Sequence, residues 1–121
     1  MSYTLSQEEE LLCAKRVARG AEFLDMRMHD WFLRINTGLL DMTDGLRCVI
    51  GQLYHPNGFT QTIVHDFRWD EKTAEEHGVI VYDGDETDEF IGGPQWAALY
   101  AELQECWLGE IANRMNGVHS G

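Results

Sequence analysis

The sequence predicts a single α+β domain that is predominantly helical, with at most a short β-hairpin. Three stretches carry apolar residues at steps of three and four, which is the pattern of a helix with one buried face. The segment between the second and third stretches alternates only weakly. With 121 residues, 44% of them hydrophobic, the chain is long enough to bury one core. We therefore expect residues 1–121 to form one domain.

The first helix is predicted over residues 7–28. Ser6 and Glu9 have the spacing of a capping box, in which each side chain bonds the backbone amide of the other residue. Gly20 costs a helix about 1 kcal/mol relative to alanine, so it indicates close approach of another backbone. Trp31 and Phe32 either continue this helix or form a separate turn packed on the core. The apolar stripe contains Leu11, Ala14, Val17, Ala18, Ala21, Leu24 and Met28.

The second helix is predicted over residues 45–55. Cys48 and Gln52 lie four residues apart and so share a face next to the apolar stripe. Gly51 leaves room for a neighbouring element. We interpret Cys48 as a core residue and Gln52 as a buried amide that ties a loop backbone to the helix, because buried amides need partners. The stripe itself contains Leu46, Val49, Ile50, Leu53 and Tyr54.

The middle of the chain is predicted to hold the strands and one short helix. Residues 59–64 fit a short strand or a loop, and residues 79–82 have the β-branched character of a strand. Between them, Asp70 is expected to cap a helix that runs through His77, and Gly78 to end it in a left-handed conformation.

The last helix is predicted over residues 94–112, with Pro94 at its first position, where a missing amide costs least. Trp107 belongs to its buried stripe and to the structural core. Residues 113–121 have no apolar period, so we expect them to form a flexible tail.

The net charge of −12 limits the function most, and it is unevenly placed. Residues 48–121 hold 13 acidic residues against three lysines or arginines. Direct binding to nucleic acid or to an anionic membrane is disfavoured, because both need clustered cations. No stretch has the length of a membrane helix, and the acidic N-terminus is unlike a signal peptide, so we expect a cytoplasmic protein. Its three cysteines fit reduced thiols better than a disulfide framework.

Several segments resemble a group of small uncharacterised proteins from actinobacteria and their bacteriophages. These segments are GAEFLDMRMHDWFLRI, LLDM, RCVIGQLY, EEHGV and LYAELQECWLGEI, and the second-helix segment is similar to an R-C-V-L-G-Q-L pattern of that group. The chain has Asp30 and Val79 where the group's pattern has proline and phenylalanine. No established activity comes with the resemblance, so it implies no catalytic residue.

The histidines and the acidic loop are weak candidates for metal sites. Cys48, His55, His65 and His77 lack the short spacings of structural zinc sites. Residues 83–89 alternate acids, but they lack the glycine and glutamate of an EF-hand loop, so a solvated turn is favoured over a calcium site. We expect no metal and no cofactor.

The acidic residues of the second half are the predicted partner-binding surface. Residues 66–89 hold ten acids against Arg68 and Lys72. Such a surface either serves solubility or docks a basic protein. The predicted contact residues are Asp70, Glu71, Glu75, Glu76, Asp83, Asp85, Glu86, Asp88 and Glu89.

The leading functional hypothesis is a non-catalytic acidic interaction module, of the kind a phage uses to inhibit or modulate a basic, nucleic-acid-binding host protein. One alternative is a small cysteine- or metal-centred enzyme that uses Cys48 and a histidine. Another is a structural or assembly subunit, which an exposed Trp31, Phe32 or Trp96 would suggest. The oligomeric state is left open by the sequence.

Overall fold

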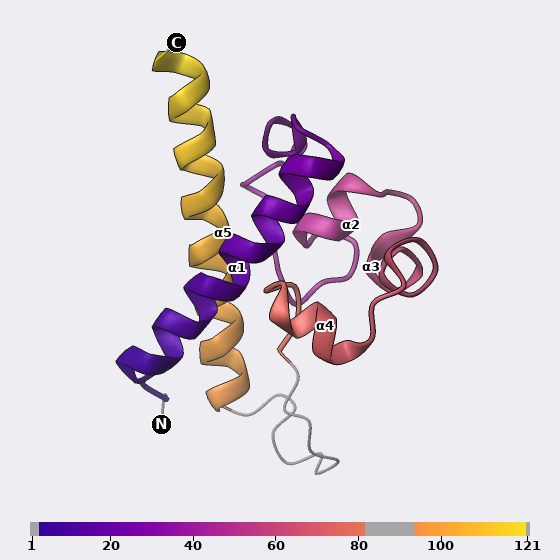
Figure 1. The fold of residues 1–121 in the computed structure, drawn as a ribbon. Coiled ribbons are helices and arrows are strands. Elements are labelled where there is room, and N and C mark those ends of the chain that lie inside the picture. Colours follow the sequence, from indigo (N-terminus) through magenta and orange to yellow (C-terminus); the bar gives the residue numbers. More distant parts are fainter. Residues whose placement is uncertain (1–2, 82–93, 121) are drawn as a thin grey trace.

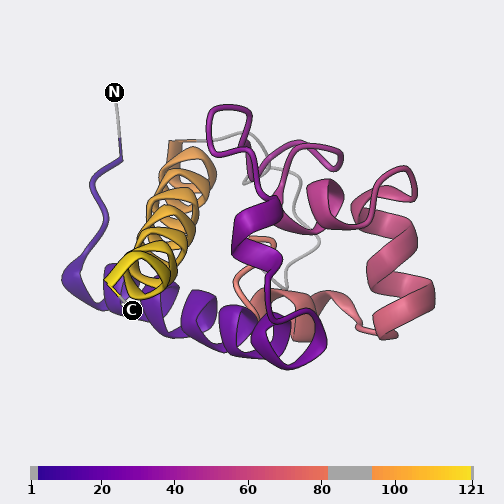
Figure 2. The same ribbon diagram turned by 90° about the horizontal axis from the view of Figure 1, so that it is seen from above.

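The computed structural model describes residues 3–81 and 94–120, and the side chains as far as residue 117. Two long helices, α1 (Gln7–Arg27) and α5 (Pro94–Ser120), cross one another along one side of the fold (Figures 1 and 2). The other side consists of the short helices η1 (Trp31–Arg34, a 3-10 helix), α2 (Val49–Leu53), α3 (Gly58–Gln61), η2 (Thr62–Phe67, a π-helix) and α4 (Glu71–Glu76).

The predominantly helical prediction is confirmed, but the α+β class is not. Residues 3–81 and 94–120 contain helices and turns and no strand. Residues 59–64, a possible strand, lie in α3 and η2 instead. Residues 79–81 form no strand either, and Tyr82 lies outside the described part. Val79 donates its backbone amide to the carbonyl of Ala74 rather than to a neighbouring strand. Its β-branched side chain is buried in the core.

The N-terminus of α1 forms as the capping box predicts. The Ser6 hydroxyl accepts a hydrogen bond from the Glu9 amide at 3.1 Å, and the Glu9 carboxylate accepts one from the Ser6 amide at 2.9 Å. The helix ends at Arg27, because Met28 leaves the helical conformation while its amide still bonds Leu24. Trp31 and Phe32 then belong to η1, a separate turn, rather than to a continuation of α1.

Helices α1, α4 and α5 meet at a junction that depends on two glycines. A Cβ on Gly20 would overlap the carbonyl oxygen of His77 and lie 3.0 Å from the Trp107 ring. Gly78 has a φ of 70°, as its predicted role at the end of α4 requires, and a Cβ there would lie 2.7 Å from the backbone nitrogen of Val17. The Trp107 indole nitrogen donates to the Gly78 carbonyl at 2.8 Å. The turn after α4 is thereby held between the two long helices.

Helix α5 extends well past its predicted end. The helix continues through Ser120, past the predicted end at residue 112, so residues 113–120 are helical. The reason is a pairing across the fold: Arg114 donates two hydrogen bonds to the Asp25 carboxylate of α1, at 2.9 and 2.7 Å. Asp25 also accepts from the Trp31 indole at 2.9 Å, and Arg114 bonds Glu110 one turn earlier.

Helix α2 is shorter than predicted, because turns occupy the first residues of the expected helix. The Asp44 carboxylate accepts from the Leu46 amide at 2.8 Å, and the Gly45 carbonyl accepts from the Phe59 amide at 2.9 Å. Cys48 is the N-cap residue, so the helix begins at Val49.

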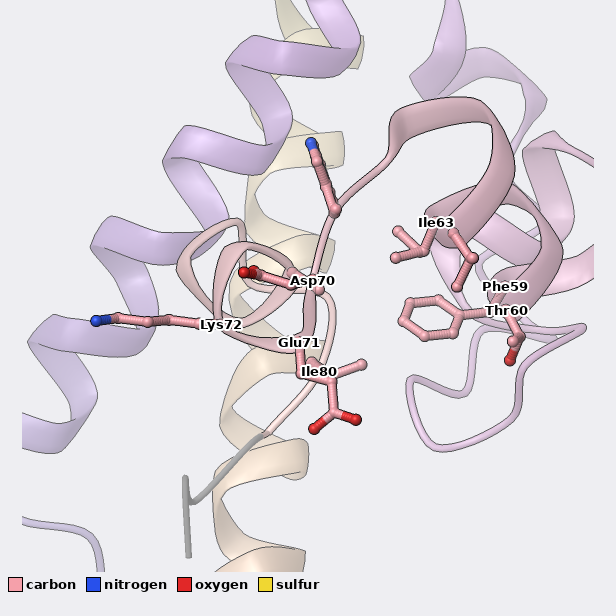
Figure 3. A pocket seen from close by; sticks show the side chains of 10 residues that line it. Phe59, Thr60, Ile63, Asp70, Glu71, Lys72 and Ile80 are labelled. Carbon is pink, nitrogen blue, oxygen red and sulfur yellow. The ribbon is translucent and has the colours of Figure 1, made fainter.

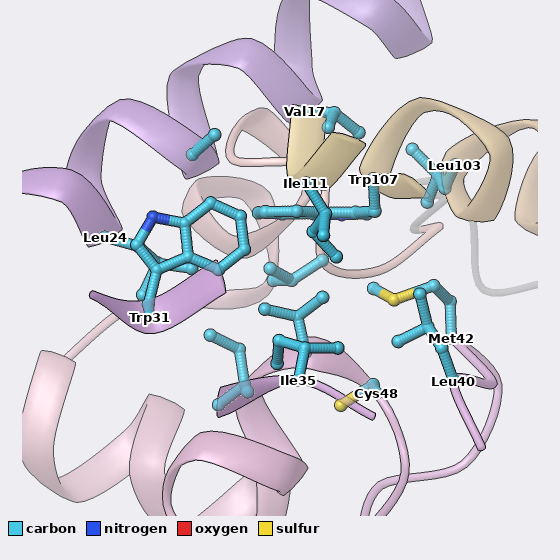
Figure 4. Packing of buried hydrophobic residues seen from close by; sticks show 14 of the residues in the cluster. Val17, Leu24, Trp31, Ile35, Leu40, Met42, Cys48, Leu103, Trp107 and Ile111 are labelled. Atoms are coloured by element: carbon cyan, nitrogen blue, oxygen red, sulfur yellow. The ribbon is translucent and has the colours of Figure 1, made fainter. Parts of the chain in front are cut away.

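The buried core lies between the long helices and the short ones (Figure 4). Trp31 and Trp107 are fully buried, and their rings meet edge to face with centroids 5.6 Å apart. Val17 and Leu24 come from α1, Ile111 comes from α5, and the short segments complete the cluster with Ile35, Leu40, Met42, Cys48, Val49, Ile50, Ile63 and Val79. The core is thus one contiguous cluster.

Candidate functional site

The Cys48 side chain faces the core and is almost inaccessible to solvent. It is 1% exposed, and its Sγ accepts a hydrogen bond from the Gly51 amide at 3.3 Å, which caps α2. Burial raises the pKa of the Cys48 thiol to about 11. At neutral pH only on the order of one thiol in ten thousand would be ionised, and the thiolate is the nucleophilic form. The geometry therefore favours packing over chemistry at this residue.

Gln52 and Gly51 connect α2 to the preceding loop. The Gln52 amide accepts from the Asn36 backbone amide at 2.7 Å and donates to the carbonyls of Asn36 and Arg47 at 3.2 and 2.9 Å. Gly51 lies against the backbone of Gly45, where a Cβ would overlap its carbonyl oxygen. These residues hold the loop in place and leave no free amide on the Gln52 side chain.

The other two cysteines are also free thiols of raised pKa. Burial is the main cause at both, raising the pKa of Cys13 and raising that of Cys106 to about 12. Cys106 donates a weak hydrogen bond to the Glu102 carboxylate at 3.7 Å. Within the described part of the chain, no three side chains of histidine, cysteine, aspartate or glutamate gather closely enough to hold a metal ion.

The predicted assembly surface is largely inside the fold. Trp31 is fully buried and Phe32 is 9% exposed. Trp96 is half-buried at the start of α5, where its ring lies 4.6 Å from that of Tyr100. These aromatic residues build the core and the helix surface rather than a large exposed patch.

Two of the predicted partner-binding acids on α4 face α1. Glu75 lies 3.5 Å from the Arg16 guanidinium, and Glu76 lies 3.9 Å from that of Arg19. The basic side of α1 therefore partly neutralises the last turn of α4, because opposite charges at this separation attract each other even near the surface.

The other two acids lie at the start of α4, next to solvent. Asp70 is the N-cap residue, and its carboxylate accepts from the Thr73 amide at 2.8 Å. Hydrogen bonds from the Thr73 side chain and amide lower the pKa of Asp70, so it is ionised throughout the neutral range. Glu71 follows in the first turn and is exposed. The remaining predicted contacts lie outside the described residues: Asp83, Asp85, Glu86, Asp88 and Glu89.

A groove of about 690 Å³ separates α4 from the π-helix η2 (Figure 3). Phe59, Ile63 and Ile80 point toward one another across it, and Glu71 also lines it. Lys72 also lines the groove, but its ammonium group points away from it. The full lining is Phe59, Thr60, Ile63, Val64, Trp69, Asp70, Glu71, Lys72, Ala74 and Ile80.

The end of the π-helix sets the width of this groove. Arg68 takes a left-handed conformation with a φ of 58°, and the Trp69 amide bonds back to the Ile63 carbonyl at 3.0 Å. The chain turns there and enters α4 at Asp70. Trp69 then stacks on His77 with ring centroids 4.1 Å apart, which fixes one wall of the groove.

Sequence reasoning missed the groove, although one signal was present. Phe59 and Ile63 lie four residues apart, which places them on one face of a helix. The same segment also alternates weakly, so it was interpreted as a strand or a loop and the helical spacing was not used. The partners from α4 and from residue 80 are brought there only by the fold.

Comparison of the chain with protein-family models, with curated proteins and with solved structures gives no match. No helix among the described residues is both long and apolar enough to cross a membrane.

Proposed function

We propose that the chain is a non-catalytic interaction module whose acid-rich second half binds a basic surface of a partner protein. The observation that carries the proposal is the groove beside α4, which is lined by an apolar floor and by the exposed Glu71. Apolar area supplies affinity at protein interfaces, and complementary charge supplies orientation and a fast encounter.

The charge distribution supports the same proposal. Asp66, Asp70 and Glu71 are exposed on the described part of the acidic segment, whereas Glu75 and Glu76 are partly neutralised by α1. Within residues 66–89 only Arg68 and Lys72 oppose ten acids. A surface of this sign attracts clustered lysines and arginines, such as those with which a nucleic-acid-binding protein contacts phosphates.

The buried thiol of Cys48 supports a non-catalytic role. A cysteine nucleophile needs a lowered pKa and access for a substrate. Cys48 has a raised pKa and is 1% exposed. The cysteine-centred alternative therefore has no support from the surroundings of this residue.

The experiment that tests the proposal is affinity capture from a cell lysate with the wild-type chain and two charge-reversed variants. The test variant replaces Asp83, Asp85, Asp88 and Glu89 by lysine. The control variant replaces an equal number of exposed acids on the long helices by lysine: Glu8, Glu10, Glu22 and Glu105.

We expect a basic protein to be retained at low salt by the wild type and by the control variant, and to be lost from the test variant. The affinity for the purified partner should fall with salt less steeply in the test variant, because fewer charges take part. A partner retained equally by both variants would contradict the proposed surface.

A further inference from the structure

The floor of the groove is apolar and reaches into the core. Ile63 is 5% exposed and Val64 is 52% exposed, so the groove extends from the core to the surface. An apolar recess supplies a contact area that charged groups alone would not supply. The groove therefore offers a contact that charge alone does not explain.

The groove is open rather than enclosed. Thr60, Val64, Asp70, Glu71 and Lys72 line it and are all exposed. A pocket for a small molecule usually surrounds most of its ligand. An open groove with an apolar floor is better suited to one side of a polypeptide, from which a bulky side chain enters while the flanking residues contact the rim.

The rim selects for positive charge. Glu71 is exposed and lines the groove, whereas the Lys72 ammonium is directed away from it (Figure 3). Asp70 is exposed at the start of the same helix, but its carboxylate caps α4 and is directed away from the groove, so Glu71 supplies the rim charge (Figure 3). A segment bound here would thus meet the Glu71 carboxylate next to the apolar floor, and lysine or arginine beside its apolar residue would be favoured.

We propose that this groove anchors a partner segment that carries a bulky apolar side chain next to lysine or arginine residues. The inference rests on the proposed function, since it names the part of the partner protein that the acidic module would bind. Phe59, Ile63 and Ile80 receive the apolar side chain, and Glu71 pairs with a neighbouring cation.

The test uses three synthetic fluorescent peptides of about 16 residues, each designed as an amphipathic helix. The first carries leucines on one face and lysines on both flanks. The second keeps the lysines and replaces the leucines by serine. The third keeps the leucines and replaces the lysines by glutamate. Fluorescence anisotropy measures the binding of each peptide to the full chain at low salt.

Two pairs of protein variants distinguish peptide binding in the groove from attraction by the overall negative charge. Val64→Asp places a charge in the groove, and Leu33→Asp makes the same change at a residue of similar exposure, 55% against 52%, on η1. Glu71→Lys reverses the rim charge, and Glu105→Lys reverses an exposed acid on α5. Circular dichroism and thermal melts of each variant verify that the fold is retained.

We expect the leucine–lysine peptide to bind the wild type at least about tenfold more tightly than either other peptide. Val64→Asp and Glu71→Lys should each weaken that binding by about fivefold or more, and the two control variants should change it less than about twofold.

The outcomes distinguish the inference from the proposed function. If both lysine peptides bind equally and Val64→Asp has no effect, the acidic surface stands and the groove inference is overturned. Equal binding of the glutamate peptide would also overturn it, because the rim would then not select for charge. If no lysine peptide binds at low salt, the proposed function and the inference fail together.

Discussion

At the scale of single residues, burial decides the chemistry of the cysteines. Cys48 caps α2 through its Sγ and faces the core, so its thiol stays protonated at neutral pH. The same residue on an exposed helix end could be activated by the helix dipole. Its surroundings, rather than its type, make it a structural residue.

The reactivity of Cys48 can be measured directly. We expect iodoacetamide to label Cys48 only when the chain unfolds, because its thiol is 1% exposed and has a pKa of about 11. Labelling with and without denaturant, followed by mass spectrometry of the cysteine peptides, gives the rate at each position. Cys106 is partly exposed and serves as the internal comparison. Rapid native labelling of Cys48 would reopen the enzyme hypothesis.

At the scale of elements, close packing of the helices rests on glycine. Gly20 brings α1 against the turn that follows α4, and Trp107 of α5 contacts the same place. The intrinsic cost of glycine in a helix is offset here by contacts that no larger residue permits.

Alanine at this position should destabilise the fold. Gly20→Ala is expected to lower the free energy of unfolding by about 2 kcal/mol or more, because the new Cβ would overlap the His77 carbonyl. Gly109→Ala is the matched control on α5, where a Cβ meets nothing within 4 Å. It should be neutral or raise the stability by up to about 1 kcal/mol. Urea denaturation followed by tryptophan fluorescence tests both, and equal effects would contradict this account of the junction.

The C-terminal part of α5 depends on the Arg114–Asp25 pair. Arg114→Met should lower the stability at neutral pH by about 1 kcal/mol, a modest value because Asp25 is 40% exposed and solvent screens the pair. It should also increase hydrogen exchange in residues 113–117. The exposed Arg34–Asp30 pair offers a control, since Arg34→Met should leave the unfolding midpoint nearly unchanged.

The effect of Arg114→Met should depend on pH. The hydrogen bond from Arg114 lowers the pKa of Asp25 below its value of about 3.9 in the unfolded chain. The stability that this carboxylate contributes is therefore present above about pH 4 and is lost as the pH falls through the folded pKa. The difference between wild type and variant should shrink over that acidic range. A difference that stays constant down to acidic pH would exclude this pair as its cause.

At the scale of the whole molecule, the arginines of α1 lie near some of the acidic residues of α4 and not near others. The arginines of α1 partly neutralise the end of α4, which leaves the start of α4 and the edge of the groove acidic. The net charge of −12 by itself predicts only a surface that repels other anions. Among the described acids, Asp70 and Glu71 line the groove.

Local rules predicted the features that depend on neighbours along the chain. The capping box of Ser6, the Asp70 cap and the left-handed Gly78 all lie where their spacing indicates, because each involves residues at most a few positions apart. Gly20 and Gly51 were also predicted to allow close approach. The predominantly helical class followed from the apolar period of the long helices.

Features with distant partners were predicted poorly. The end of α5 was placed too early, because its residues have no apolar period and Arg114 finds Asp25 only across the fold. Residues 59–64 were expected to form a strand or a loop, but they lie in α3 and η2, since their apolar residues suit more than one structure until α4 packs beside them. The sequence thus determined the existence of the two long helices, the N-terminal caps of α1 and α4, and the overall charge. The tertiary structure decided the burial of Cys48, the neutralised acids and the groove, because each requires residues that only folding brings together.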